Sequence, residues 1–310
     1  MARKSELAAG KRQEGHVQVS GGKIWYGTAG GSGKGVPLVV IHGGPGASHD
    51  YLEPLEALAE SRPVIFYDQL DCGNSDRPGD PEHWTVERYV DELHELITAL
   101  GLGRVHLLGQ SWGAAIAAEY ALSGQGDAVA SLVLSGPMLS TPRWDADQRK
   151  YIAMLPDAVR NTITASEASG DFATPAYQEA MMYYYRLHVC RLECWPDCLT
   201  RTFEKVSAGP YVHMWGPSEF TINGTLRNYD LSGRLREISV PVLLTCGEHD
   251  EAAPSTVEYF RSLIPGAELR VFSGASHEHH LEKTAEYLAA VQSFLGRGVR
   301  PTACSKESPW

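Results

Sequence analysis

One serine set between two glycines constrains the fold of this chain more than any other feature. The apolar run 105–108 ends at Gly109, the chain passes through Ser111 and Gly113, and small helix-forming residues follow at 114–120. A buried strand, a sharp turn at serine and a helix form a nucleophile elbow, whose glycines let strand and helix approach closely. A plain Gly-Ser loop is the alternative, and the strand-like and helix-like flanks disfavour it. The motif predicts an α/β fold with a serine hydroxyl raised at a strand end.

Apolar runs on either side of the elbow repeat this alternation. Further strands are predicted at 37–41, 64–68, 131–136, 240–247 and 268–272, and a hairpin is predicted at 16–20 and 23–27. Residues 85–100 carry apolar side chains at spacings of three or four behind Thr85, a candidate cap, and residues 284–294 form a closing helix. The order of elements predicts a mostly parallel central sheet with helices on both faces.

The alternation stops between residues 138 and 229, a segment rich in Trp, Tyr, Met and Pro with helical runs such as 177–191. We interpret this segment as a helical cap inserted into the sheet domain. The predicted organisation is a first part of the core at 1–137, the cap at 138–229, a second part of the core at 230–299 and a polar tail at 300–310. Residues 1–16 are charged and lack periodicity, which predicts a loosely docked arm.

The composition limits the binding partners and the cellular compartment that can be expected. A formal net charge of −11 disfavours a general affinity for nucleic acid or for anionic membranes. No apolar run reaches the roughly 20 residues of a membrane-spanning helix, and residues 1–17 lack the apolar region of a secretory signal. Six cysteines in 310 residues do not suggest a disulfide framework. We therefore expect a cytoplasmic protein that acts on a small molecule or a peptide.

Three cysteines come closest to a metal pattern. Cys190, Cys194 and Cys198 are spaced four apart and would share one helix face if the segment were helical. Trp195 and Pro196 interrupt such a helix, so packing thiols are the favoured interpretation. No metal and no cofactor are expected.

An activated serine needs a base within hydrogen-bond reach and a carboxylate that orients this base, and in this architecture the acid comes first along the chain. Asp250 follows the predicted strand 240–247, and His277 follows the predicted strand 268–272. His279 and His280 compete as bases, but both lie further along the chain, so we interpret them as surface residues or as residues behind the base. The order and the strand-end positions predict a triad of Ser111, Asp250 and His277.

A loop dense in glycine follows the strand 37–41. It reads His42-Gly43-Gly44-Pro45-Gly46, and its backbone N–H groups are left uncovered by side chains. Such a loop can approach and stabilise a developing oxyanion. A tight turn alone would need only one glycine, so the loop predicts an oxyanion hole.

At these residues the chain resembles the proline iminopeptidase family of α/β-hydrolases, and more closely its amino-acid amidase and tricorn-interacting aminopeptidase-like members. The resemblance runs from about residue 35 to 295 and rests on the segments HGGPGASHDY (42–51), YDQ (67–69), CGNSDRP (72–78), GQSWG (109–113) and GPSEF (216–220). It implies the same triad and an oxyanion hole made by the backbone N–H groups of Gly44 and Trp112. Family members cleave a free N-terminal residue, often proline, from peptides, amides or arylamides.

An exopeptidase must hold a free ammonium group, and a buried carboxylate pair can do so. Glu219 in the predicted cap and Glu251 beside the predicted acid are the candidates, and the resemblance implies the same pair; surface salt bridges are the alternative for each. Two residues depart from the family pattern, Asp71 in place of a glycine and Ala114 in place of a second glycine after the elbow. Four aromatic residues are expected in the core rather than in the pocket wall: Trp112, Tyr184, Tyr185 and Trp215.

Several functions remain open at this point. The first is a serine aminopeptidase or amidase that releases an N-terminal amino acid, proline or similar, from small peptides or amino-acid amides through an acyl-enzyme. The second is an esterase or a specialised-metabolite amide hydrolase of the same fold. The third is a non-catalytic ligand-binding protein, because fold does not fix function. The preferred first residue and the oligomeric state are also open.

Overall fold

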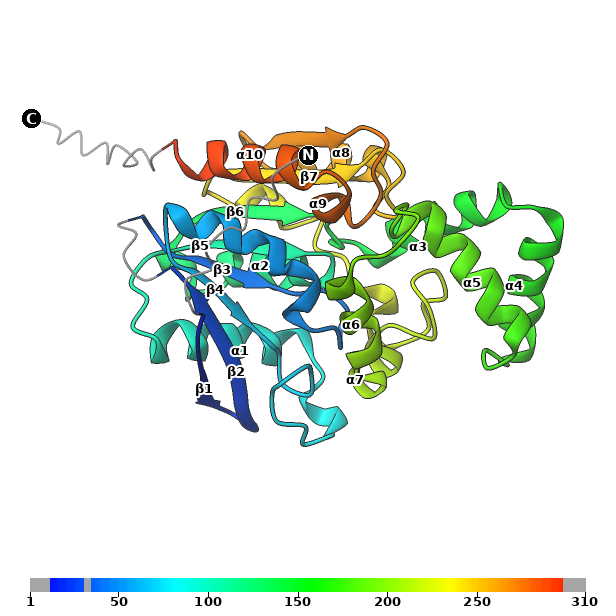
Figure 1. The fold of residues 1–310 in the computed structure, drawn as a ribbon, viewed down its shortest axis with the longest axis horizontal. Coiled ribbons are helices and arrows are strands. Elements are labelled where there is room, and N and C mark those ends of the chain that lie inside the picture. The colour runs from blue at the N-terminus through cyan, green and yellow to red at the C-terminus, as the bar shows by residue number, and fades with distance from the viewer. Residues whose placement is uncertain (1–11, 31–34, 298–310) are drawn as a thin grey trace, which may run out of the picture.

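A single eight-stranded sheet lies at the centre of the computed structural model, which describes residues 12–30 and 35–297 (Figure 1). The strand order is β1-β2-β4-β3-β5-β6-β7-β8. The strands are β1 (Gln13–Val19), β2 (Gly22–Ala29), β3 (Leu38–Ile41), β4 (Val64–Tyr67), β5 (Val105–Gln110), β6 (Val129–Ser135), β7 (Val242–Gly247) and β8 (Glu268–Phe272). The pairs β1–β2 and β2–β4 are antiparallel and the remaining pairs are parallel. The predicted mostly parallel sheet is confirmed.

Alternate residues of the central strands pack into two separate hydrophobic cores, one on each face of the sheet. In β3, Val39 and Ile41 join one apolar cluster, whereas Leu38 and Val40 join the other. Both faces of this strand are therefore buried, which explains why its sequence is a continuous apolar run without alternation. Helices α1 (Val86–Ala99), α2 (Trp112–Leu122) and α8 (Pro254–Leu263) cover the first face. The 3₁₀ helix η1 (His49–Glu60) and α10 (Thr284–Leu295) cover the second.

Local signals set several element ends. Thr85 caps α1 by accepting a hydrogen bond from the backbone N–H of Arg88, as predicted. The hairpin of β1 and β2 turns at Gly21, whose φ of 95° favours glycine. Helix η1 was not predicted from the sequence, because Pro54 and the 3₁₀ geometry obscure the helical spacing of its apolar residues.

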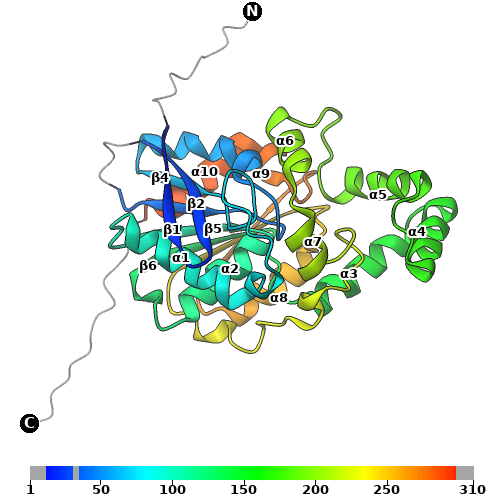
Figure 2. The same cartoon turned by 90° about the horizontal axis from the view of Figure 1, so that it is seen from below.

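Five helices between β6 and β7 lie beyond the carboxyl ends of the strands (Figures 1 and 2). They are α3 (Thr141–Ala153), α4 (Asp157–Ser169), α5 (Pro175–His188), α6 (Asp197–Lys205) and α7 (Ala208–Met214). Residues of α3, α4 and α5 form a third apolar cluster with Phe220. Helix α6 packs against η1, where Arg201 and Lys205 both pair with Asp50. The division of the chain at 137/138 and 229/230 stays a prediction.

The structure tests the predictions for the two ends of the chain only in part. The loosely docked arm predicted over 1–16 is wrong for its last residues, because 13–16 pair with β2 as the start of β1. The alternation of exposed and buried side chains needed to recognise an edge strand begins only at residue 16, which explains the error. The rest of the arm up to residue 11, and the polar tail at 300–310, lie outside the described residues.

Candidate active site

Ser111 sits at the turn between β5 and α2 in a strained backbone conformation. Its φ of 53° lies in the left-handed region that non-glycine residues rarely adopt. The backbone N–H of Ser111 donates to the carbonyl of Ser135 on β6 at 2.8 Å, which helps to hold the turn. A Cβ atom at Gly109 would collide with the backbone of Gly113, and one at Gly113 would collide with that of Ile41. The glycines are therefore required for the close approach of α2 to the sheet.

His277 and Asp250 meet at the ends of β8 and β7. Nδ1 of His277 lies 2.7 Å from Oδ1 of Asp250, and both side chains are buried. Asp250 also accepts hydrogen bonds from the backbone N–H groups of Gly247 and Ala252. Burial alone would raise the pKa of Asp250, but the adjacent His277 outweighs burial and lowers it. The carboxylate thus stays ionised and holds the imidazole through Nδ1, and His277 and Ser111 line the same cavity.

The negative charges around His277 change its proton affinity. Burial alone would lower the pKa of His277, but Asp250 and then Glu251 outweigh burial and raise this pKa to about 10. Oε1 of Glu251 lies 3.6 Å from Nε2 of His277. The carboxylates around His277 thus favour its protonated form.

Both competing histidines are buried, so the prediction that they could be surface residues is wrong. Nε2 of His279 lies 3.0 Å from Oγ of Ser135 and 2.9 Å from Oγ1 of Thr245. Nε2 of His280 donates to the carbonyl of Tyr51 at 3.0 Å. The short helix α9 (His279–Glu282) folds back beneath the base and turns both rings into the protein, which a polar run in the sequence did not reveal. The alternative interpretation, residues behind the base, agrees with these contacts.

The glycine loop after β3 borders the cavity directly beside the elbow. Gly44 lines the cavity, and its φ of 112° favours glycine. The N–H of Gly43 donates to the hydroxyl of Tyr51 at 2.7 Å, and this hydroxyl donates to Gln110 at 2.6 Å. The backbone N–H groups of Gly44 and Trp112 donate to no other group of residues 12–30 and 35–297. They are available to an oxyanion, and their role remains a prediction.

Glu219 and Glu251 lie in the same cavity, as their predicted role requires. The hydroxyl of Tyr211 on α7 donates to Oε1 of Glu219 at 2.7 Å. Glu251 is buried, and neither of its carboxylate oxygens has a hydrogen-bond partner among the described residues. Burial, followed by the charge of Glu219, raises the pKa of Glu251 well above its usual value. Burial also raises the pKa of Glu219, against the hydrogen bond from Tyr211.

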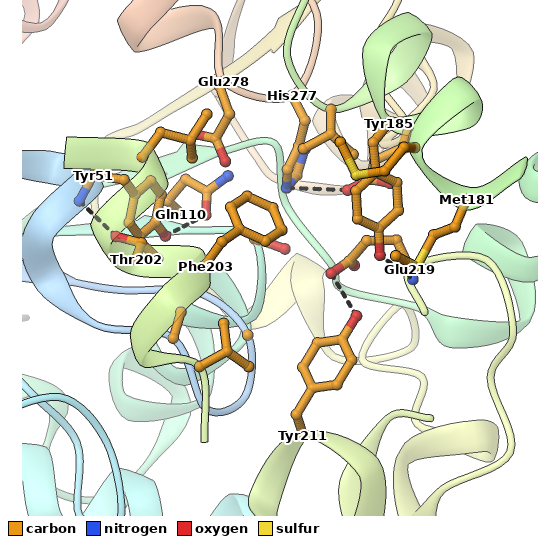
Figure 3. A pocket seen from close by; sticks show the side chains of 18 of the residues that line it. Tyr51, Gln110, Met181, Tyr185, Thr202, Phe203, Tyr211, Glu219, His277 and Glu278 are labelled. Atoms are coloured by element: carbon orange, nitrogen blue, oxygen red, sulfur yellow. Dashed lines mark hydrogen bonds and ion pairs between the residues drawn. The ribbon is translucent and has the colours of Figure 1, made fainter. Parts of the chain in front are cut away.

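The cavity has a volume of ≈ 260 Å³ and lies between the sheet and the helices α5, α6 and α7 (Figure 3). Three of the four aromatic residues expected in the core are absent from its described lining, whereas Tyr185 forms part of its wall. Several lining residues were not predicted from the sequence: Tyr51, Gln110, Met181, Met182, Phe203, Tyr211 and Glu278. Glu278 carried a usable signal, because it adjoins His277 as Glu251 adjoins Asp250.

The two departures from the family pattern do not line the cavity. Asp71 has a φ of 67°, a conformation that glycine adopts without strain. Its carboxylate accepts hydrogen bonds from Nε1 of Trp84 at 2.9 Å and from the N–H of Gly79 at 2.8 Å. Ala114 is fully buried in α2. Asp71 therefore replaces the freedom of glycine with two specific hydrogen bonds.

One cluster of potential metal ligands lies outside the cavity. His49, Asp50 and Glu53 place ligand atoms within 4.8 Å of one another. Arg201 pairs with both Asp50 and Glu53, and Lys205 pairs with Asp50. These cations already neutralise the carboxylates, so the cluster fastens α6 to η1 and is a poor cation site.

Comparisons with known proteins agree with this geometry. Residues 36–284 match the family model of the alpha/beta hydrolase fold. The chain is 42% identical to a proline iminopeptidase from Heyndrickxia coagulans, over 91% of this chain and 98% of the relative. The crystal structure of proline iminopeptidase from Mycobacterium smegmatis has a TM-score of 0.85 at 37% identity, covering 92% of this chain and 98% of that one. The crystal structure of VinJ has a TM-score of 0.88 at 34% identity and the same coverage.

The sheet order, the elbow and the family match together define an α/β-hydrolase. The sequence identity to proline iminopeptidases, and the share of the chain over which it extends, then identify the family within this class. The chain belongs to the proline iminopeptidase family.

Proposed function

We propose that the chain is a serine aminopeptidase that releases an N-terminal amino acid, proline or similar, from peptides or amino-acid amides. The observation that carries the proposal is Glu251, a buried carboxylate without a hydrogen-bond partner in the described chain, 3.6 Å from the His277 ring in the cavity that Ser111 lines. A buried carboxylate of this kind needs a cation. A free N-terminal ammonium group supplies one directly beside the nucleophile.

The chemistry uses Ser111, Asp250 and His277 as one unit. Nε2 of His277 takes the Ser111 hydroxyl proton while Oγ attacks the substrate carbonyl, and Asp250 stabilises the imidazolium that forms. The N–H groups of Gly44 and Trp112 stabilise the oxyanion. His277 then gives the proton to the leaving amine, which departs and leaves an acyl-enzyme. Water, deprotonated by His277, hydrolyses the ester and frees the amino acid.

Binding of the ammonium group also prepares the base. The charges of Asp250 and Glu251 raise the pKa of His277 to about 10 and so favour its protonated form. A substrate ammonium between Glu219 and Glu251 offsets part of this charge and lowers the pKa of His277 toward the range of a general base. An acylated terminus carries no charge, so it neither offsets Glu251 nor activates His277. Discrimination against blocked termini thus acts on binding and on the chemical step together.

The test compares free and N-acetylated aminoacyl-arylamides in wild type, Glu219→Gln and Glu251→Gln. Each substitution keeps the shape but removes a charge-assisted hydrogen bond of about 1.5–3 kcal/mol, so kcat/KM for free substrates should fall about tenfold to a hundredfold. Simple neutral esters should lose little. Glu258→Gln is the control, because Glu258 is exposed on α8 and pairs with Arg261.

Equal losses on amine-bearing and neutral substrates would assign both glutamates a supporting role and favour an esterase. No hydrolysis of any ester or arylamide by wild type would favour a ligand-binding protein. The screen also ranks proline against other first residues.

We further propose a cytoplasmic location and a small peptide or amide as the partner. Five cysteines of the described chain are free thiols, which suits a reducing compartment. Within the described residues, no helix combines the length and the apolar character that a membrane span requires.

A further inference from the structure

Glu278 is a third carboxylate in the cavity, and the chemistry proposed above does not use it. Its side chain is buried, and it lines the cavity together with Ser111 and His277. Oε2 has no hydrogen-bond partner among the described residues. The backbone N–H of Glu278 donates to the carbonyl of Val189 at 2.9 Å, which fixes the start of the side chain. The backbone of Glu278 is thus held in place, while its carboxylate has no hydrogen-bond partner at Oε2 among the described residues.

Glu278 lies on the opposite side of His277 from the ammonium pair. Figure 3 shows Glu278 on the side of Tyr51 and Gln110, whereas Glu219 lies beyond His277 on the other side. The electrostatic couplings agree, because the charge of Glu219 raises the pKa of Glu251 more than the charge of Glu278 does. The pKa of Tyr51, by contrast, responds to Glu278 more than to Glu219. The cavity therefore has two acidic ends with the nucleophile and the base between them.

Among the described residues Glu278 forms no ion pair with Lys or Arg, and the charge of His277 lowers its pKa without outweighing burial. None of the described residues that line the cavity is Lys or Arg. The nearest ring nitrogen is Nδ1 of His280, 3.6 Å from Oε2 of Glu278. Nε2 of His280 donates to the Tyr51 carbonyl, and burial lowers the pKa of His280 to about 3, so this ring is neutral and turns a lone pair toward Glu278. Burial accordingly raises the pKa of Glu278 to about 8.

A substrate bound for hydrolysis would extend across both ends. Its ammonium lies between Glu219 and Glu251, its carbonyl lies at Ser111, and its leaving part continues past His277, which must protonate it. Glu278 borders that second half of the cavity. Aliphatic side chains, Val189 and Leu199 among them, also line the cavity and can pack against a hydrocarbon stem.

We propose that Glu278 binds a cation on the leaving part of the substrate, so that the enzyme prefers a free N-terminal residue joined to a basic leaving group, such as a peptide with Lys or ornithine in second place. This inference rests on the proposed aminopeptidase function. The substrate class is then a dication, with one charge at each acidic end of the cavity.

The experiment measures kcat/KM for prolyl-norleucine amide, prolyl-ornithine amide and prolyl-lysine amide with wild type, Glu278→Gln and Glu286→Gln. Wild type should cleave the ornithine or the lysine substrate about tenfold faster than the norleucine substrate, as one charge-assisted hydrogen bond implies. Glu278→Gln should reduce this ratio to near one. Glu286 is exposed on α10 and does not line the cavity, so Glu286→Gln controls for net charge and should keep the wild-type ratio.

The ratio separates recognition from an indirect effect. Glu278 also contributes to the raised pKa of His277, but a change in the base alters all three substrates alike and leaves the ratio unchanged. A wild-type ratio near one, or an unchanged ratio in Glu278→Gln, would overturn the inference while the aminopeptidase function stands. No cleavage of prolyl-norleucine amide or of a prolyl arylamide by wild type would reject the proposed function, and this inference with it.

Discussion

Two groups of buried carboxylates lie just after strands of the same sheet, and their surroundings differ. Asp68 follows β4 and accepts hydrogen bonds from the backbone N–H and Nδ1 of His49 and from the N–H of Asn74. Glu251 and Glu278 follow β7 and β8 and carry oxygens without a partner in the described chain. Burial opposes ionisation in both groups.

The difference separates structural acids from binding acids. Hydrogen bonds from His49 outweigh burial and lower the pKa of Asp68, whereas the pKa values of Glu251 and Glu278 are raised. The desolvation of Asp68 is offset within the chain, so this residue stabilises the fold. That of Glu251 and Glu278 is offset only in part, by the charge of His277, so under the proposed functions both residues weaken the free protein and favour the complex. Substitutions in the two regions should therefore change different measurements.

The largest expected effect lies in the cavity. Ser111→Ala should lower kcat by at least about a thousandfold, because the hydroxyl forms the covalent bond. The melting temperature should stay close to that of wild type, since the glycines set the elbow. His277→Ala should lose activity similarly, and the double substitution should lose little more. Steady-state kinetics and thermal melts check both points. Inactivation by His279→Ala or His280→Ala, with an active His277→Ala, would refute the assignment of the base.

The second expected effect is a loss of stability, and it concerns Asp68, the structural carboxylate of the comparison. Asp68→Ala leaves buried donors of His49 and Asn74 unpaired, so the free energy of unfolding should fall by about 3 kcal/mol. Urea denaturation monitored by tryptophan fluorescence measures this change. Asp76→Ala is the control: Asp76 is exposed and accepts a bond from the N–H of Lys23, so the loss of this bond should cost under about 1 kcal/mol. Equal effects of the two substitutions would contradict the interpretation of Asp68 as a carboxylate that stabilises the fold.

A third measurement uses pH to distinguish the regions. The folded-state pKa of Glu278 is raised from 4.5 to about 8, so the folded protein holds this proton more tightly than the unfolded chain does. Glu278 therefore weakens the protein progressively as pH rises from about 4.5 to 8. Glu278→Gln should match wild type in stability at about pH 4 and exceed it by at least about 1 kcal/mol at pH 8. Urea denaturation at several pH values checks this.

The control for this pH series is Glu286→Gln, which removes an exposed charge and should show no such trend. A variant Glu278→Gln that is less stable than wild type at pH 8 would mean that the carboxylate has a partner within the chain. Glu278 would then belong with Asp68 in the comparison.

Much of this arrangement was predictable from sequence, for physical reasons that differ by residue. Strands buried on both faces read as apolar runs, and the elbow needs glycines at fixed positions, so the sheet and Ser111 were identifiable. Asp250 and His277 followed from their order and strand-end positions. The family was recognisable from short motifs, and the comparisons confirm it.

The unpredicted part depends on contacts between segments distant in sequence. Tyr51 enters the cavity because η1 turns it toward Gln110, 59 positions away. Apart from its adjacency to His277, Glu278 reads as a surface residue in the polar run 277–280, and only the fold buries it. Local pattern carries no information on such burial, because it depends on the cap helices that close over the strand ends.

The smallest expected effect concerns Asp71, which connects the two regions. It lies in the loop after Asp68, and its hydrogen bond holds Trp84, whose ring meets His213 of α7 at 5.3 Å between centroids. Helix α7 also carries Tyr211, the donor to Glu219.

Asp71→Gly would relieve the positive φ, a gain of about 1 kcal/mol, but would remove two hydrogen bonds worth about 1 kcal/mol each. The loss of the two hydrogen bonds outweighs the relief of backbone strain, so the free energy of unfolding should fall by about 1 kcal/mol or less. Since Trp84 supports α7, kcat/KM for free aminoacyl-arylamides should also fall about twofold, through KM. Asp71→Asn tolerates the same φ and keeps one acceptor, so it should lie between wild type and glycine. A glycine variant more stable than wild type would show that backbone strain outweighs both hydrogen bonds, and that the aspartate is retained for the position of α7 rather than for stability.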